Sequence, residues 1–212
     1  MNYRLFAVLL ACPVAVVAGV LVRSELIEFD FKDPKGVNAM TFLIDSTLEP
    51  IHGTATGISG KVFFDPERPE AAHGKIVVAT SSLKVTHATM TGHLHGQRWL
   101  DAERHPTIEF EIKKVKPKPS EGDSSAIAAD VTGDFSMHGV TKELTIPVTA
   151  TYLKDALGRR VRGMQGDLVV IRCQFKLSRK AFGIGEGMPE MSVGDAIELR
   201  VAIVGIAPAS GQ

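Results

Sequence analysis

Residues 130–152, DVTGDFSMHGVTKELTIPVTATY, show the fold class most clearly. In the second half of this stretch Leu144, Ile146 and Val148 occupy alternate positions, separated by Thr145 and Pro147. A period of two places alternate side chains on opposite faces of a β-strand. Gly139 has no Cβ and suits a tight reversal between two such strands. The stretch therefore predicts an antiparallel hairpin with one apolar face, which needs further strands to cover it.

The rest of the chain supplies those strands. Two patterns predict them, namely alternating apolar positions and segments rich in β-branched residues and glycine. The predicted strands are residues 26–31, 37–44, 53–64, 74–85, 107–113, 169–177 and 197–203. The alternation fails over residues 86–105, which predict a short helix or packed loop over one end of the sheet, and residues 116–125 predict a polar surface loop. About eight antiparallel strands are typical of a barrel or a sandwich, and periodicity alone leaves both open.

The composition is that of a folded domain without a charge bias. Of the 212 residues 44% are hydrophobic, and 24 basic residues balance 24 acidic ones. A sizeable core can form, and the zero net charge gives no sign of a nucleic acid partner. Cys12 lies in the leading apolar segment, so Cys173 would lack a partner if that segment were removed. We therefore expect no internal disulfide, and we interpret Cys173 as a small core residue.

Residues 1–24 predict an export signal or a membrane anchor. Arg4 is the only charge before the apolar run 5–22. A basic head followed by an apolar block is typical of a cleaved signal, and a run of this length also reaches the span of a bilayer, which would anchor the protein to the inner membrane. A third alternative is a bacterial lipoprotein, because LLAC at residues 9–12 resembles the box that ends at a lipidated cysteine. All three place the folded domain, residues 25–207, in the periplasm or otherwise outside the cytoplasm, with 208–212 as a short tail.

His93 and His95 are the strongest candidates for a metal-binding or catalytic role. On a strand, His93 and His95 would lie on one face, as metal ligands often do, with His87 and His105 nearby. A His-dependent metal protein or enzyme is therefore one alternative, and hydrogen-bonded or solvated histidines in a capping segment are the other, which we favour. The chain has no G-x-S-x-G elbow, and the glycines of residues 182–189 have the wrong spacing for a dinucleotide site. We predict a protein that is not an enzyme, with no catalytic residue, metal or cofactor.

Several short sequence blocks occur in the same order as the motifs of a known protein family. They are FFDP at 63–66, HL at 93–94 followed by HPTIEF at 105–110, VTGDFSMHGVTK at 131–142, SRKAFGI at 178–184 and VGD at 193–195. Together they resemble the YceI-like family, lipocalin-like barrels that bind polyisoprenoids or similar lipids. Two polar pairs of the family are replaced, one by Met90-Thr91 and one near Val37-Asn38. These changes leave the identity of the ligand open.

The resemblance implies an all-β fold, an antiparallel eight-stranded lipocalin-like barrel with a short helical or loop cap. It also implies non-catalytic binding, and transport or sequestration, of a polyisoprenoid, a quinone-like molecule or another long apolar lipid in the lumen. A barrel of about eight strands is just wide enough for one slender ligand. The same inward residues could instead fill the barrel, which would leave a membrane-tethered interaction module as an alternative. The candidate residues of the lumen or its mouth are Phe42, Phe64, Leu94, Trp99, Ile108, Phe110, Phe135, Ile146, Phe175 and Phe182.

Overall fold

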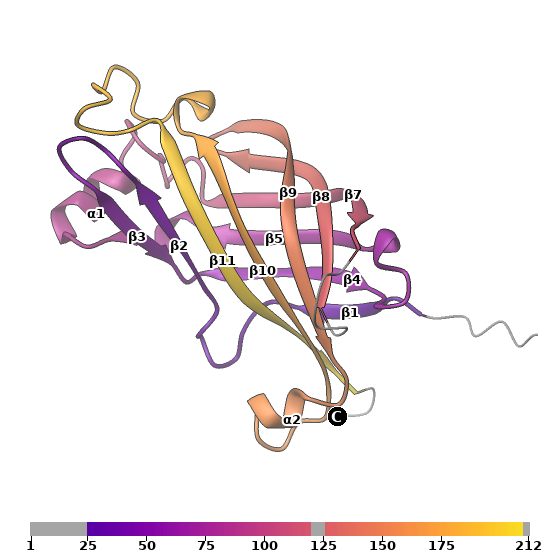
Figure 1. The fold of residues 1–212 in the computed structure, drawn as a ribbon. Coiled ribbons are helices and arrows are strands. Elements are labelled where there is room, and N and C mark those ends of the chain that lie inside the picture. The colour runs from indigo at the N-terminus through magenta and orange to yellow at the C-terminus, as the bar shows by residue number, and fades with distance from the viewer. Residues whose placement is uncertain (1–24, 120–125, 210–212) are drawn as a thin grey trace, which may run out of the picture.

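The computed structural model describes residues 25–119 and 126–209, which form an antiparallel β-barrel (Figure 1). Eight strands make a closed ring, because the last strand pairs with both its predecessor and the first strand. In ring order these strands are β1 (Ile27–Asp30), β4 (Ile58–Phe64), β5 (His73–Ala79), β7 (Thr107–Pro117), β8 (Ala126–Met137), β9 (Val140–Leu153), β10 (Gly166–Ser178) and β11 (Ala196–Pro208). The predicted all-β, eight-stranded barrel is confirmed.

Three further strands extend the sheet from the edge of β11. The first half of β11 pairs with β2 (Ala39–Ile44), which pairs in turn with β3 (Ile51–Ala55) and then β6 (Leu83–Val85). The helix α1 (Ala88–His95) packs beside β6, and the short helix α2 (Leu157–Arg160) packs against β10 and β11 at the far end of the molecule (Figure 1). The predicted helix or loop within residues 86–105 is therefore a helix.

The hairpin of residues 130–152 is confirmed and is longer than its alternating core. Its register runs from Ala126 opposite Thr151 to Met137 opposite Val140. His138 and Gly139 form the turn with φ angles of 52° and 74°. Positive φ at both central residues is the requirement of a type I′ hairpin turn, whose twist matches that of the strands, and glycine meets this requirement without steric cost.

The predicted strand at residues 53–64 is divided into β3 and β4. The break falls at Gly57, where a Cβ would lie 2.8 Å from the Cβ of Ser82 and 2.9 Å from that of Ala79. The chain therefore bends here to allow a close approach to another segment. That approach is a tertiary contact, and strand periodicity contains no sign of it.

The predicted strand at residues 74–85 is divided as well. A short 3-10 turn, Thr80–Ser82, separates β5 from β6. Thr80 is buried, and its hydroxyl donates a hydrogen bond to the carbonyl oxygen of His105 at 2.7 Å. A buried hydroxyl needs such a partner, so the turn is fixed by a residue far away in the sequence.

Aromatic side chains close the barrel near α2. Phe29 and Phe31 are fully buried, and the Phe29 ring centroid lies 6.4 Å from those of Phe64 and Tyr152. Phe31 packs directly over Gly205, where a Cβ would come within 2.8 Å of its ring. This end of the interior is therefore packed solid.

Two predictions concern segments outside the described residues. The signal, anchor or lipoprotein segment 1–24 is one, and most of the surface loop 116–125 is the other, since β7 continues to Pro117. Within the described ranges, no helix has both the length and the apolar character needed to cross a bilayer.

Candidate functional site

The barrel encloses a cavity of about 200 Å³. Apart from Glu109 and Arg179, every residue that lines it is aliphatic, aromatic, methionine or cysteine. We call this cavity the lumen. Its wall offers water almost no hydrogen-bonding partner, and cavities of this kind stay dry and accept apolar molecules.

The alternation read from the sequence builds this wall. On β10 the inward residues are Val169, Ile171, Cys173, Phe175 and Leu177, and all five line the lumen. The strands β2 and β11 contribute in the same way through every second residue. On β7 the alternation of Ile108, Phe110 and Ile112 holds up to a register shift after Ile112, beyond which Val115 lines the lumen. The predicted one-sided faces of these strands are therefore confirmed.

Several inward side chains remain partly exposed. Phe110, Ile127, Ala150, Ile171 and Phe175 all line the lumen, and each is only half-buried. In a solid core, inward apolar residues are close-packed and lose their accessible surface. The exposure of these residues shows that the middle of the barrel is hollow.

Nine of the ten candidate residues line the lumen, namely Phe42, Phe64, Leu94, Trp99, Ile108, Phe110, Phe135, Ile146 and Phe175. The tenth, Phe182, lies behind this wall. It is 1% exposed, and its ring centroid lies 5.6 Å from that of Phe135, which in turn lies 6.3 Å from that of Phe175. Phe182 therefore supports the lumen wall and caps the core.

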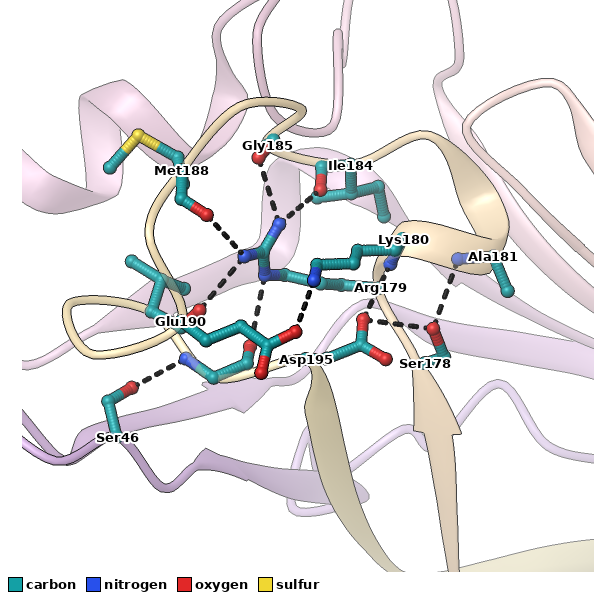
Figure 2. A network of polar contacts seen from close by, with 12 residues as sticks. Ser46, Ser178, Arg179, Lys180, Ala181, Ile184, Gly185, Met188, Glu190 and Asp195 are labelled. Carbon is teal, nitrogen blue, oxygen red and sulfur yellow. Dashed lines mark hydrogen bonds and ion pairs between the residues drawn. The ribbon is translucent and has the colours of Figure 1, made fainter.

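A fully buried arginine at one end of the lumen was not among the candidates. Among the described residues, the guanidinium of Arg179 has no ion-pair partner and donates only to backbone carbonyl oxygens (Figure 2). The acceptors are Gly185 at 2.8 Å, Ile184 and Val193 at 2.9 Å, Gly194 at 3.0 Å (from Nε) and Met188 at 3.4 Å. These bonds use the full donor set of the side chain. Arg179 thus fixes the loop after β10 over the end of the lumen.

Polar groups around Arg179 hold the start of the same loop. The carboxylate of Asp195 accepts hydrogen bonds from the hydroxyl of Ser178 at 2.9 Å and the backbone N–H of Lys180 at 3.0 Å (Figure 2). Burial alone would raise the pKa of Asp195, but these bonds and the charges of Lys180 and Arg179 outweigh it and lower the pKa. The resulting anion compensates part of the buried positive charge.

Cys173 is a wall residue of the lumen. Burial raises the pKa of its thiol to about 12, so the thiol stays protonated at neutral pH. A protonated thiol is a poor nucleophile. The interior position predicted for Cys173 is confirmed, and it carries no sign of reactivity.

The strand geometry considered for His93 and His95 is wrong, because both residues lie on α1. Residues two apart on a helix point about 200° away from each other, so the two imidazoles do not share a face. Nε2 of His95 makes a hydrogen bond with the carbonyl oxygen of Leu83 at 2.8 Å. In the part of the chain that the structure describes, no group of three or more His, Cys, Asp or Glu side chains is placed to hold a metal ion.

Comparison with known proteins agrees with this architecture. The family model described as YceI-like domain matches residues 33–205. A UPF0312 protein of Pseudomonas fluorescens is 32% identical over 167 residues, which cover 76% of this chain and 83% of that protein. The crystal structure of Burkholderia cenocepacia BcnA has a TM-score of 0.62 at 19% identity and covers 79% of this chain and 95% of that one.

A second solved structure has the same fold. It is a polyisoprenoid binding domain from Saccharophagus degradans, with a TM-score of 0.61, 10% identity, and coverage of 86% of this chain and 99% of that domain. At such identities the two structures establish the fold, while the family model spans most of the described chain. The protein belongs to the YceI-like family.

Proposed function

We propose that the protein binds one long-chain apolar lipid, a polyisoprenoid or a quinone-like molecule, in its lumen. No bond is made or broken, and the protein carries or sequesters the lipid through an aqueous compartment outside the cytoplasm. The observation that carries the proposal is the hollow, apolar lumen. The family membership and the name of the Saccharophagus domain support the class of ligand.

Burial of hydrocarbon supplies the free energy of binding. Each methylene removed from water contributes about 0.8 kcal/mol, so an isoprene unit of five carbons contributes about 4 kcal/mol. Loss of translational and rotational freedom costs roughly 4–15 kcal/mol on association. A few isoprene units therefore outweigh this cost without any polar contact.

The size of the lumen restricts the shape of the ligand. Its volume of about 200 Å³ falls below the roughly 300–1,000 Å³ of pockets that hold drug-sized molecules. A space of this size favours a slender, flexible chain. A wall without hydrogen-bonding groups selects such a chain by length and girth.

A matched pair of Phe→Asp variants tests the proposal. Phe110 lines the lumen, whereas Phe63 lies on the outside of β4, where its ring stacks on His73 with centroids 4.9 Å apart. Phe110→Asp should abolish retention of an added polyisoprenoid alcohol, because an ionised carboxylate in an apolar cavity is strongly unfavourable. Phe63→Asp should retain it. Equal lipid retention by both folded variants, checked by circular dichroism, would count against the lumen as the binding site.

A further inference from the structure

The barrel wall is incomplete between β9 and β10. Their pairing begins at Leu168 opposite Leu153 and ends at Cys173 opposite Val148, although both strands continue well beyond that point. The next residue of β9 is Pro147, which has no N–H with which to extend a ladder. Beyond Cys173 and Val148 no ladder joins the two strands in the described chain, and a 2.9 Å hydrogen bond between His138 and the carbonyl oxygen of Phe182 links the β8–β9 turn to the segment after β10. We call the point where they part the fork.

A groove of about 490 Å³ lies on the outer surface at the fork. Three of its lining residues, Ala129, Val148 and Cys173, also line the lumen. The groove and the lumen are therefore separated by a single layer of small and medium side chains, at the place where the backbone ladder stops. The other groove residues are Lys118, Ala128, Pro147, Thr149, Arg172, Gln174 and Arg200.

The groove carries uncompensated positive charge. Lys118 is paired with Asp130 at 2.6 Å. The exposed guanidinium groups of Arg172 and Arg200, in contrast, make no hydrogen bond or ion pair with the described residues. Arg200 interacts at longer range with Glu198, whose carboxylate is already paired with Lys176. Arg172 and Arg200 thus face a groove in which the only other charged lining residue, Lys118, is already paired with Asp130.

The two arginines are placed to share one anion. Arg200 lies opposite Gln174 in the β10–β11 ladder, and Arg172 is the residue of β10 two positions before Gln174. Such diagonal neighbours lie about 7–8 Å apart, within reach of long side chains. Guanidinium groups bind phosphate oxygens through paired hydrogen bonds, and a phosphate monoester carries about −1.5 to −2 charges at pH 7.

We propose that the groove at the fork binds the anionic headgroup, a phosphate or diphosphate, of the lipid whose tail occupies the lumen. This inference rests on the proposed function and adds to it the chemical class of the headgroup. The tail passes between the separated ends of β9 and β10, where side chains and not backbone hydrogen bonds form the wall. The headgroup remains in water, held by Arg172 and Arg200.

Binding of a lipid pair to the full chain tests the inference. The probes are geranylgeraniol and geranylgeranyl monophosphate, which share a tail and differ in the headgroup. The wild-type protein should bind the phosphate about tenfold more tightly, as two exposed charge pairs allow. In Arg172→Gln/Arg200→Gln this preference should disappear. The control Arg159→Gln/Arg162→Gln removes two exposed arginines from the β9–β10 connection, one on α2 and one just after it, and should keep the preference.

The outcomes separate this inference from the proposed function. Equal affinity of the wild-type protein for both lipids would overturn the headgroup site and leave the lumen intact as a binding site. Binding of neither lipid would overturn both. Inorganic phosphate alone, if it bound as tightly as the lipid phosphate, would identify a site for free anions and overturn the headgroup assignment. A preference that persisted in Arg172→Gln/Arg200→Gln would place the anion elsewhere.

Discussion

Replacement of Ala150 by tryptophan should remove lipid binding without loss of stability. Ala150 lies in the middle of β9, opposite Ile127 on β8 and Ile171 on β10, and its side chain is a half-buried part of the lumen wall. An indole at this position projects into the lumen. Because the space there is hollow, the new side chain can be accommodated without displacing packed neighbours.

The magnitudes follow from what the indole displaces. Exclusion of one isoprene unit, five carbons at about 0.8 kcal/mol each, costs about 4 kcal/mol of binding free energy. That loss corresponds to a factor of roughly 700 in Kd. In a solid core the same substitution would overpack the interior and cost about 1–3 kcal/mol of folding stability. The two architectures therefore predict different combinations of affinity and stability.

The assay combines a lipid-binding titration with urea denaturation monitored by circular dichroism. Thr151→Trp is the control, because Thr151 is the adjacent residue of β9 and is not part of the lumen wall. We expect the control to bind lipid normally and Ala150→Trp to bind at least a hundredfold more weakly with an unchanged urea midpoint. A midpoint that falls by the overpacking penalty, or an unchanged affinity, would refute the hollow barrel.

Three further predictions concern the buried polar groups. Arg179→Met leaves several carbonyl oxygens without their hydrogen-bond donor. The free energy of unfolding, measured by urea titration, should fall by about 3–5 kcal/mol. A loss below about 1 kcal/mol would show that the loop does not depend on Arg179. Burial raises the pKa of the Cys173 thiol to about 12. At about pH 8 the thiol of the folded protein should therefore react with maleimide at least about a hundredfold more slowly than that of the urea-unfolded protein, and more slowly still when lipid is bound. Similar rates in the folded and unfolded protein would contradict the position of Cys173 in the lumen. Burial by itself would raise the pKa of Asp33, but hydrogen bonds from three backbone N–H groups and from Arg160 at 2.7 Å outweigh it and lower the pKa below 3.8. A carboxylate whose pKa is lowered in the folded state stabilises the fold at any pH above its pKa in the unfolded chain, and this stabilisation is lost as the pH falls below about 4. Asp33→Asn should therefore be less stable than the wild type at neutral pH and should lose less stability in acid. Parallel profiles of stability against pH for the variant and the wild type would refute this.

The strand faces could be predicted because they are a local property. A period of two is visible in the sequence of β7, β10 and β11, and the alternating apolar residues predicted from it line the lumen. The β8–β9 turn was also predictable, because Gly139 meets a local backbone requirement. Once the faces were known, nine of the ten lumen candidates followed.

The remaining features depend on contacts that no local pattern encodes. The breaks at Gly57 and Thr80 come from a close approach and a buried hydroxyl, each involving distant segments. Arg179 has the sequence context of a surface residue after a strand, and its burial becomes visible only when the loop folds over it. Arg172 and Arg200 occupy outward positions where polar residues are ordinary, so only the groove at the fork distinguishes them.

The central claim is that the lumen is open and holds one lipid, and native mass spectrometry of the purified chain tests it most directly. Incubation with a graded series of polyisoprenoid alcohols should give one bound lipid per chain, with occupancy that rises with tail length until the lumen is filled and that is absent from Ala150→Trp. A spectrum with only the bare chain, or binding that is the same in wild type and Ala150→Trp, would contradict the claim.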